Sequence, residues 1–418
     1  MMNISNSPKY NAGPIAFESL SEAAEVEQAS VISDATAGDY RDVIDEYIKN
    51  GYVTVYDRSV ENVCSASLKN GTSHIHITYL KASGMLIVTP ELNRVSTADV
   101  SYDCAESGGF EFYMYGINMD PGGFNPNLDF SADFNTSGFA NCGMLLAARA
   151  SDNSIIVIDG GLVSQFLGGA LSTLNRFLHK IARKEEGEVV TISAWYISHA
   201  HHDHYEGFAA MLEKFHEQYR LERILSTFPE RQVAAFKAQF TPAADTIKTH
   251  FPDVIDYKLH TGDRITLGDV TLSVLYTHEC SVDSDGKTEV VDFNDTTTVA
   301  TLESKDMRVM LLGDISELAE DKIVTSYTKE TLHSDIVQVA HHNFNHLVKI
   351  YEPISAPIAC FTQALEGTRK NESTRANAAP VLDTSKEFYY NGDITKTVGF
   401  GIKDGKVVKV FSYSDMVV

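Results

Sequence analysis

A cluster of histidines and one aspartate directly follows an apolar segment, and it constrains the fold of this 418-residue chain more than any other feature. The segment 193–197 reads SAWYI, and the next residues read SHAHHDHYEG. Alternate side chains of an extended strand share a face, so His199 and His201 point the same way. Asp203 and His204 follow where the chain turns into the next helix. Imidazole and carboxylate groups bind divalent metal ions, so the cluster predicts a metal site at the end of a buried strand.

Other apolar segments also end in aspartate or histidine. Asp159 follows SIIVI, Asp314 ends MRVMLLGD, and His341 and His342 end DIVQVAHH. In open α/β sheets, ligands bind outside the carboxyl ends of the strands, so we expect these residues at one common edge. Taken alone, Asp314 is well explained as a helix N-cap, and the histidine pair as core or surface residues. Their occurrence together with the 199–204 cluster favours a metal site.

The length of the chain indicates more than one domain. Residues 1–38 are polar and are interpreted as a flexible or packed N-terminal arm. Residues 39–104 contain one helical pattern and four strand-like segments, which predict a small α+β domain of unknown role. His74 and His76 alternate along one of these strands and are expected on a solvated face rather than in a metal site. In residues 105–418 strands and helices alternate, which predicts a layered α/β domain.

The motifs resemble those of a known family. His199-x-His201-x-Asp203-His204 resembles the HxHxDH motif of the metallo-β-lactamase superfamily, and 155–161 resembles that family's strand ending in Asp-Gly-Gly. The later segments GDRITLGDVTLSVLYT, DFNDTTTVATLES, MLLGD and VQVAHH are similar, in this order, to the hydrolase domain of ComEC-type proteins and their phosphodiesterase-like relatives. The resemblance covers about 110–415. It implies an α/β fold, a four-layer αββα sandwich, following the small N-terminal α+β domain.

The resemblance also implies a centre of two divalent ions. Six residues are its implied ligands: His199 and His201 for the first ion, Asp203, His204 and His341 for the second, and Asp314 between both. Asp159 would orient a ligand histidine from behind. Which of His341 and His342 binds metal is left open; His341 is favoured, with His342 facing the substrate. Many members carry a further ligand histidine before the bridging aspartate. His260 and His278 lie in that interval without the expected surroundings.

Two such ions lower the pKa of a bridging water, and the resulting hydroxide attacks a phosphorus or carbonyl centre. Asp203 would help to orient this nucleophile, and His342 would donate a proton to the leaving group. Zinc fits the ligand types best, and manganese or iron is also accommodated. The expected function is a metal-dependent hydrolase acting on a phosphodiester or a related small ester. The alternatives are a lactonase, thioesterase or β-lactamase on the same site, or a non-catalytic metal-binding module.

The formal charge of −23 disfavours nucleic acid as a partner and leaves a small anionic or ester substrate as the expectation. Arg369, Lys370 and Arg375 lie in a segment that forms either a rim of the site or an exposed loop. No apolar run is long enough to span a bilayer, and the first residues do not resemble a signal peptide, so a cytoplasmic protein is expected. The sequence predicts no oligomeric state.

Overall fold

The computed structural model of the chain describes residues 29–92, 109–117, 143–166, 169–228, 247–279, 290, 292–362, 372–392 and 396–416. These residues form three β-sheets of five, nine and seven strands. The expected mixed α/β architecture is confirmed. Among the described residues, no helix is long and apolar enough to cross a membrane.

The first sheet is antiparallel and has the strand order β1-β5-β4-β3-β2. Its strands are β1 (Ser30–Ile32), β2 (Val53–Val60), β3 (Val63–Asn70), β4 (Ser73–Leu80) and β5 (Met85–Leu92). Helix α1 (Ala37–Lys49) packs on one face through Tyr40, Ile44 and Tyr47, and a capping box at Thr36 begins it. The three-residue strand β1 lies within the segment interpreted as an N-terminal arm, and a strand this short carries no alternating pattern to predict it.

The second sheet has the order β12-β11-β9-β8-β7-β6-β20-β21, and β10 pairs with β9. Its strands are β6 (Glu111–Met114), β7 (Leu145–Arg149), β8 (Ile155–Asp159), β9 (Val190–Ile197), β10 (Tyr219–Leu221), β11 (Arg223–Ser226), β12 (Ile255–Lys258), β20 (Val398–Lys403) and β21 (Lys406–Ser412). Strands β7 and β8 form an antiparallel hairpin about Asp152. Strands β8, β9 and β11 run parallel, so their carboxyl ends meet at one edge.

The third sheet runs in sequence order from β13 to β19. Its strands are β13 (Arg264–Leu267), β14 (Val270–Tyr276), β15 (Val299–Glu303), β16 (Arg308–Leu311), β17 (Ile336–Gln338), β18 (Ile358–Phe361) and β19 (Glu387–Tyr390). Strands β16 to β19 are parallel, whereas β13 to β16 are antiparallel. The parallel strands are joined through α6 (Glu317–Ser326), α7 (Lys329–Leu332), α8 (Tyr351–Ile354) and α9 (Glu372–Thr384).

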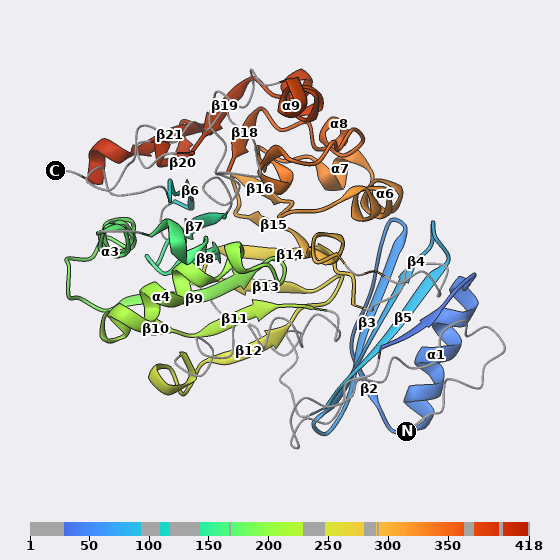
Figure 1. Cartoon of the computed structure of the whole chain (residues 1–418). Coiled ribbons are helices and arrows are strands. Elements are labelled where there is room, and N and C mark those ends of the chain that lie inside the picture. Colours follow the sequence, from blue (N-terminus) through green and yellow to red (C-terminus); the bar gives the residue numbers. More distant parts are fainter. Residues whose placement is uncertain are drawn as a thin grey trace.

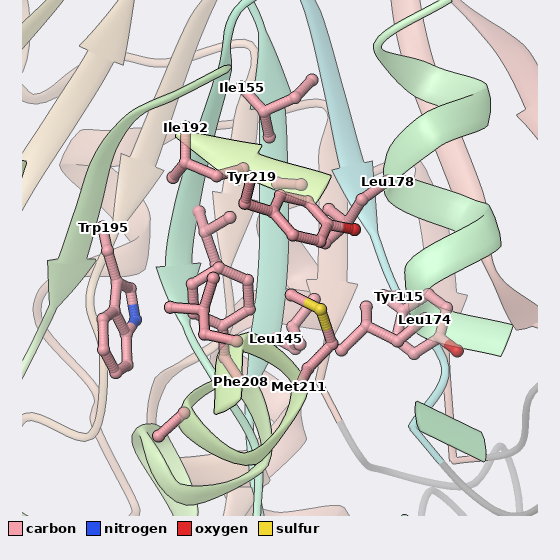
Figure 2. Close-up of a cluster of buried hydrophobic side chains, with 14 of the residues drawn as sticks. Tyr115, Leu145, Ile155, Leu174, Leu178, Ile192, Trp195, Phe208, Met211 and Tyr219 are labelled. Atoms are coloured by element: carbon pink, nitrogen blue, oxygen red, sulfur yellow. The ribbon is translucent and has the colours of Figure 1, made fainter. Parts of the chain in front are cut away.

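The second and third sheets pack face to face, and helices cover their outer faces (Figure 1). Helices α3 (Ala170–Ile181) and α4 (Glu206–Phe215) cover the second sheet. Leu174, Phe177, Leu178 and Ile181 recur at helical spacing on α3 and are buried against this sheet. Figure 2 shows part of this core, where Phe208 and Met211 of α4 lie beside strand residues. The result is the four-layer αββα sandwich that the resemblance implied.

The first sheet packs against the sandwich on the face opposite α1. Leu80, Met85 and Ile87 share an apolar core with residues of the third sheet and of α6. His74 and His76 lie on this same contact face and are 4% and 2% exposed. The prediction of a solvated face for them is wrong. The ring of His76 stacks on that of His260, with 3.5 Å between centroids, so the polar face is covered by another part of the chain.

Candidate metal centre

The strand ends bring the predicted site residues to one edge of the sandwich. Asp159 ends β8, and the chain leaves β9 at Ser198 just before the histidine cluster. On the facing sheet, Asp314 follows β16 and His341 follows β17. Within each sheet the two strands are parallel, so their carboxyl ends lie at one edge of that sheet, and the contact between His204 and Asp314 joins the two edges. The structure therefore places these residues at one common edge, as the sequence predicted.

The histidine cluster folds back on itself through a short 3₁₀ turn at His202–His204. The rings of His199 and His204 lie 4.1 Å apart between centroids. Nε2 of His199 is 3.0 Å from Nδ1 of His201. Nε2 of His204 is 3.2 Å from Oδ2 of Asp314. The turn thus places side chains from adjacent sequence positions around one centre, which the facing sheet completes.

Asp159 supports the histidine cluster through hydrogen bonds to Ser198 and His204. It is fully buried, and its φ of 58° ends β8 in a left-handed turn. Its Oδ1 accepts a hydrogen bond from the Ser198 amide at 2.7 Å, and its Oδ2 accepts from the Ser198 hydroxyl at 2.8 Å. Nδ1 of His204 donates to the same Oδ2 at 2.6 Å. One carboxylate therefore fixes both the end of β9 and the orientation of a candidate ligand.

His341 and His342 occupy different positions in the site. Nε2 of His342 lies 3.3 Å from Oδ2 of Asp314 and 3.6 Å from Oδ2 of Asp203. Nε2 of His341 lies 3.9 Å from Oδ2 of Asp314, and its side chain is 24% exposed against 1% for His342. Both residues are left-handed, with φ of 47° and 50°. His342 thus points between the two carboxylates, and His341 lies toward the open side.

Three histidines share one hydrogen-bonding arrangement. Nδ1 of His204 is bound to Asp159, Nδ1 of His199 lies 3.0 Å from the Ser198 hydroxyl, and Nδ1 of His342 lies 3.2 Å from the Thr362 carbonyl. Each contact leaves Nε2 directed at the centre. A fixed Nδ1 and an available Nε2 is the usual state of a metal-binding histidine.

Two groups of side chains are close enough to share an ion. Their possible ligand atoms lie within 4.8 Å of one another, and the groups are His199, His204 and Asp314, and Asp203, His204 and His342. In the described part of the chain, Oδ1 of Asp314, Nε2 of His342 and Nδ1 of His341 are buried without a well-formed hydrogen bond. Unpaired buried polar atoms are costly in a folded protein. A divalent cation with nitrogen and oxygen ligands satisfies Asp314 and His342, so these residues fit the implied ions.

The buried carboxylates and imidazoles of this centre shift one another's pKa. Burial alone would raise the pKa of Asp203 and Asp314, but the charges of His204 and His342 lower both. Burial would lower the pKa of His342, but Asp314, followed by Asp203, raises it to about 9. The pKa of His204 is likewise raised well above its usual value, against burial, by Asp314, Asp159 and Asp203. A bound cation would compete with the proton for these two rings.

The pKa of the first two histidines shifts in the opposite direction. Burial, together with the charge of His204, holds the pKa of His199 well below its usual value. Burial also lowers the pKa of His201, whose ring lies 5.1 Å from that of Phe293. Neutral imidazole is the form that binds a metal, so both rings are prepared for it.

His260 and His278 do not join this centre. Nδ1 of His260 lies 2.8 Å from Oε2 of Glu279, and Nδ1 of His278 lies 2.8 Å from the Tyr276 hydroxyl. Neither belongs to a group of shared ligand atoms in the described ranges. The segment with Arg369 and Lys370 lies outside the described residues. For Arg375, only its place in α9 is described.

Two supporting residues were missed by the sequence reasoning. Ser198 connects Asp159 to His199, and its place between strand and motif was the only signal for it. The buried Gln338 side chain accepts from the amides of Leu312 and Gly313 and donates to the Gly313 carbonyl. It thereby holds the turn that presents Asp314. A glutamine within an apolar strand carried no such indication.

Comparison with known proteins assigns the family. The model of the metallo-β-lactamase superfamily matches residues 136–350, about half of the chain. The chain belongs to this superfamily, and it is an enzyme of the metal-dependent hydrolase class. No curated protein matches the chain.

Several solved structures are similar to the chain at low identity. The metallo-β-lactamase fold protein YhfI of Bacillus subtilis is 14% identical, with 70% of this chain and 99% of that chain covered and a TM-score of 0.41. Zinc-bound PqqB of Methylobacterium extorquens is 9% identical, with 72% and 100% covered and a TM-score of 0.40. Human tRNase Z, short form, is 12% identical, with 55% and 76% covered and a TM-score of 0.29.

Proposed function

We propose that the protein hydrolyses a phosphodiester or a related small ester at a centre of two divalent ions, with zinc favoured. The observation that carries the proposal is the shared arrangement of His199, His204 and His342, each with Nδ1 held by a polar neighbour, together with the approach of Nε2 of His204 and of His342 to Asp314. The substrate class rests on the order of motifs after the histidine cluster, which is similar to that of phosphodiesterase-like relatives.

The proposed ligands follow from these contacts. His199 and His201 with Asp314 would hold one ion, and Asp203, His204 and His342 with Asp314 would hold the other. Of the adjacent residues His341 and His342, the sequence favoured His341 as the ligand of the second ion. The position of His342 between Asp203 and Asp314, and its bond to the Thr362 carbonyl, support an exchange of the two roles.

When bound, such ions act as Lewis acids and lower the pKa of water toward neutrality. The protein's own residues would orient the reactants. Asp203 is the most exposed of the candidate carboxylates, at 15% of its side chain, and its Oδ2 can hold a proton of the attacking water. His341 lies toward the open side, where its imidazole can donate a proton to the leaving oxygen.

The test is turnover of the metal-loaded, full-length protein on a bis-aryl phosphodiester, a lactone, an aryl thioester and a chromogenic cephalosporin. We expect the phosphodiester to have the highest kcat/KM. Asp314→Asn should lower it by about 10³-fold, or about 4 kcal/mol of transition-state stabilisation. Asp321→Asn changes an exposed aspartate on α6 and serves as the control.

Turnover of the lactone, thioester or cephalosporin alone would replace the phosphodiester by that substrate class. No turnover of any ester by protein with its metal bound would favour a non-catalytic metal-binding module.

A further inference from the structure

Two phenylalanine side chains lie beside the candidate ligands of the metal centre. The ring of Phe293, which precedes β15, is 5.1 Å from that of His201 between centroids. The ring of Phe344, which follows β17, is 5.7 Å from that of His341 and 6.0 Å from that of His342. Neither phenylalanine can act as a ligand or a proton donor, so the apolar rings at these places need another explanation.

The two phenylalanines stand at the ends of a continuous series of rings around the centre. Neighbouring centroids in this series are between 4.1 and 6.0 Å apart, and the six rings in order are Phe293, His201, His199, His204, His342 and Phe344. Both phenylalanines are half-buried. The side chain of His341, which also contacts the ring of Phe344, is 24% exposed. The open side of the centre therefore lies next to Phe344.

Hydrogen bonds hold the backbone of Phe344 on both sides. Its amide donates to the His341 carbonyl at 2.6 Å. Nδ2 of Asn377, on α9, donates to the Phe344 carbonyl at 2.7 Å and to the Asn343 carbonyl at 3.2 Å. The fold thus fixes an apolar ring beside the open side of the centre. Covering such a ring with another apolar group is favourable, and an aromatic pair gains more than the buried area alone provides.

We propose that Phe344 determines substrate specificity by contacting an aromatic ring that the substrate carries next to the reacting ester. This inference rests on the proposed function, since it names the substituent of the ester that is hydrolysed there. Sites for small molecules combine apolar and aromatic walls with a few polar groups that fix the orientation. Here the polar groups are the Asp and His side chains of the centre, and Phe344 is the aromatic wall beside them.

Calorimetric titration of phenylphosphonate and methylphosphonate into the metal-loaded, full-length protein tests the proposal. The two probes carry the same phosphonate group and differ only in the ring. We expect phenylphosphonate to bind about tenfold more tightly, and Phe344→Ala to remove this advantage without changing the binding of methylphosphonate. Phe344→Tyr keeps the ring and should keep the advantage. Melting temperature and metal content check that both variants fold and retain their metal.

Phe215→Ala is the matched control. Phe215 is also half-buried, but it ends α4, nine residue steps or about 14 Å along the helix from Glu206 beside the histidine cluster. Both phosphonates should bind this variant as they bind the wild type. Equal weakening of the two phosphonates in Phe344→Ala, or loss of the phenyl advantage in the control, would overturn the proposal. A wild-type protein that does not bind phenylphosphonate would also overturn it.

Turnover separates this proposal from the proposed function. Phe344→Ala should lower kcat/KM for the bis-aryl phosphodiester by about tenfold, mainly through a higher KM, because the lost contact is made with the bound substrate as well. Equal turnover by the wild type and by Phe344→Ala would overturn the role of Phe344 and leave the proposed function intact. Ring-dependent binding of the phosphonates without turnover of any ester would contradict the proposed function and still support the aromatic contact.

Discussion

Asp159 and Ser198 connect the backbone of the second sheet to the candidate ligands without facing the open side of the site. Asp159 accepts the amide and hydroxyl of Ser198 and the ring N–H of His204, and it is fully buried. Burial raises its pKa in spite of the opposing charge of His204. Such a residue acts through its neighbours, by fixing the ring that presents a nitrogen to the ion.

Asp159→Asn should therefore weaken metal binding by about 10- to 100-fold. Asp159 accepts through both carboxylate oxygens, whereas asparagine has only one acceptor oxygen, so it cannot hold the Ser198 amide and the His204 ring at the same time. Competition with a chelator measures the affinity. A purely structural role would instead lower the melting temperature and leave the affinity of the folded protein unchanged.

His341 and His342 provide a paired test at adjacent positions. His342→Ala should lower metal content and reduce kcat/KM by about 10²-fold or more, since it removes a buried side chain between two carboxylates. His341→Ala should retain the metal and lower mainly kcat. The reverse pattern in metal content would restore His341 as the ligand.

At the scale of elements, left-handed turns end the strands that carry the site. Asp159, Gly313 and His341 have φ of 58°, 53° and 47° respectively. This conformation costs an L-residue about 1–2 kcal/mol, so packing must hold it. A Cβ built on Gly313 would lie 2.5 Å from Cγ2 of Thr297 and 3.1 Å from the Ser198 side chain. The turn before Asp314 thus requires glycine for two separate reasons.

Gly313→Ala should destabilise the protein by about 2–4 kcal/mol, from the left-handed conformation and the close contact together. Gly71→Ala isolates the first effect, because Gly71 has a φ of 61° and no atom within 4 Å of its Cβ position. Its cost should be about 1 kcal/mol. Urea unfolding gives both values. Equal losses of stability in Gly313→Ala and Gly71→Ala would show that the protein accommodates the new Cβ beside Thr297 without a cost.

The pattern of apolar segments followed by Asp or His across β8, β9, β16 and β17 predicted a layered α/β domain with these residues at one edge, and the family resemblance implied the four-layer sandwich. It could not distinguish His341 from His342, since the left-handed backbone at both positions decides where each ring points. Nor did it predict the contact of His76 with His260, because alternation along a strand does not show what covers each face. Tertiary contacts determine both features.

At the scale of the molecule, polar contacts join the first sheet to the sandwich. Tyr56 donates to Asp263 at 2.9 Å, and the Thr89 hydroxyl donates to Glu279 at 2.7 Å. Glu279 also lies 2.8 Å from Nδ1 of His260. Burial would raise the pKa of Glu279, but His260, with Lys258 and Thr89, lowers it to about 2. This contact is therefore stronger when Glu279 is ionised.

A carboxylate with a depressed pKa stabilises the fold above its unfolded pKa, and this contribution is lost as the pH falls through the folded value. For Glu279 the loss lies between about 4.5 and about 2. The stability lost by Glu279→Gln should be on the order of 3 kcal/mol near neutral pH and should shrink in this acid range. Urea unfolding at several pH values measures it. A difference independent of pH would contradict the ionic role.

Elemental mass spectrometry of the full-length protein, purified without a histidine tag, tests most directly whether the Asp and His side chains at the carboxyl ends of the two sheets hold two metal ions. We predict about two transition-metal ions per chain, falling sharply in both His201→Ala and Asp314→Ala. Protein that holds no metal after reconstitution, or that keeps its metal in both variants, would contradict the claim.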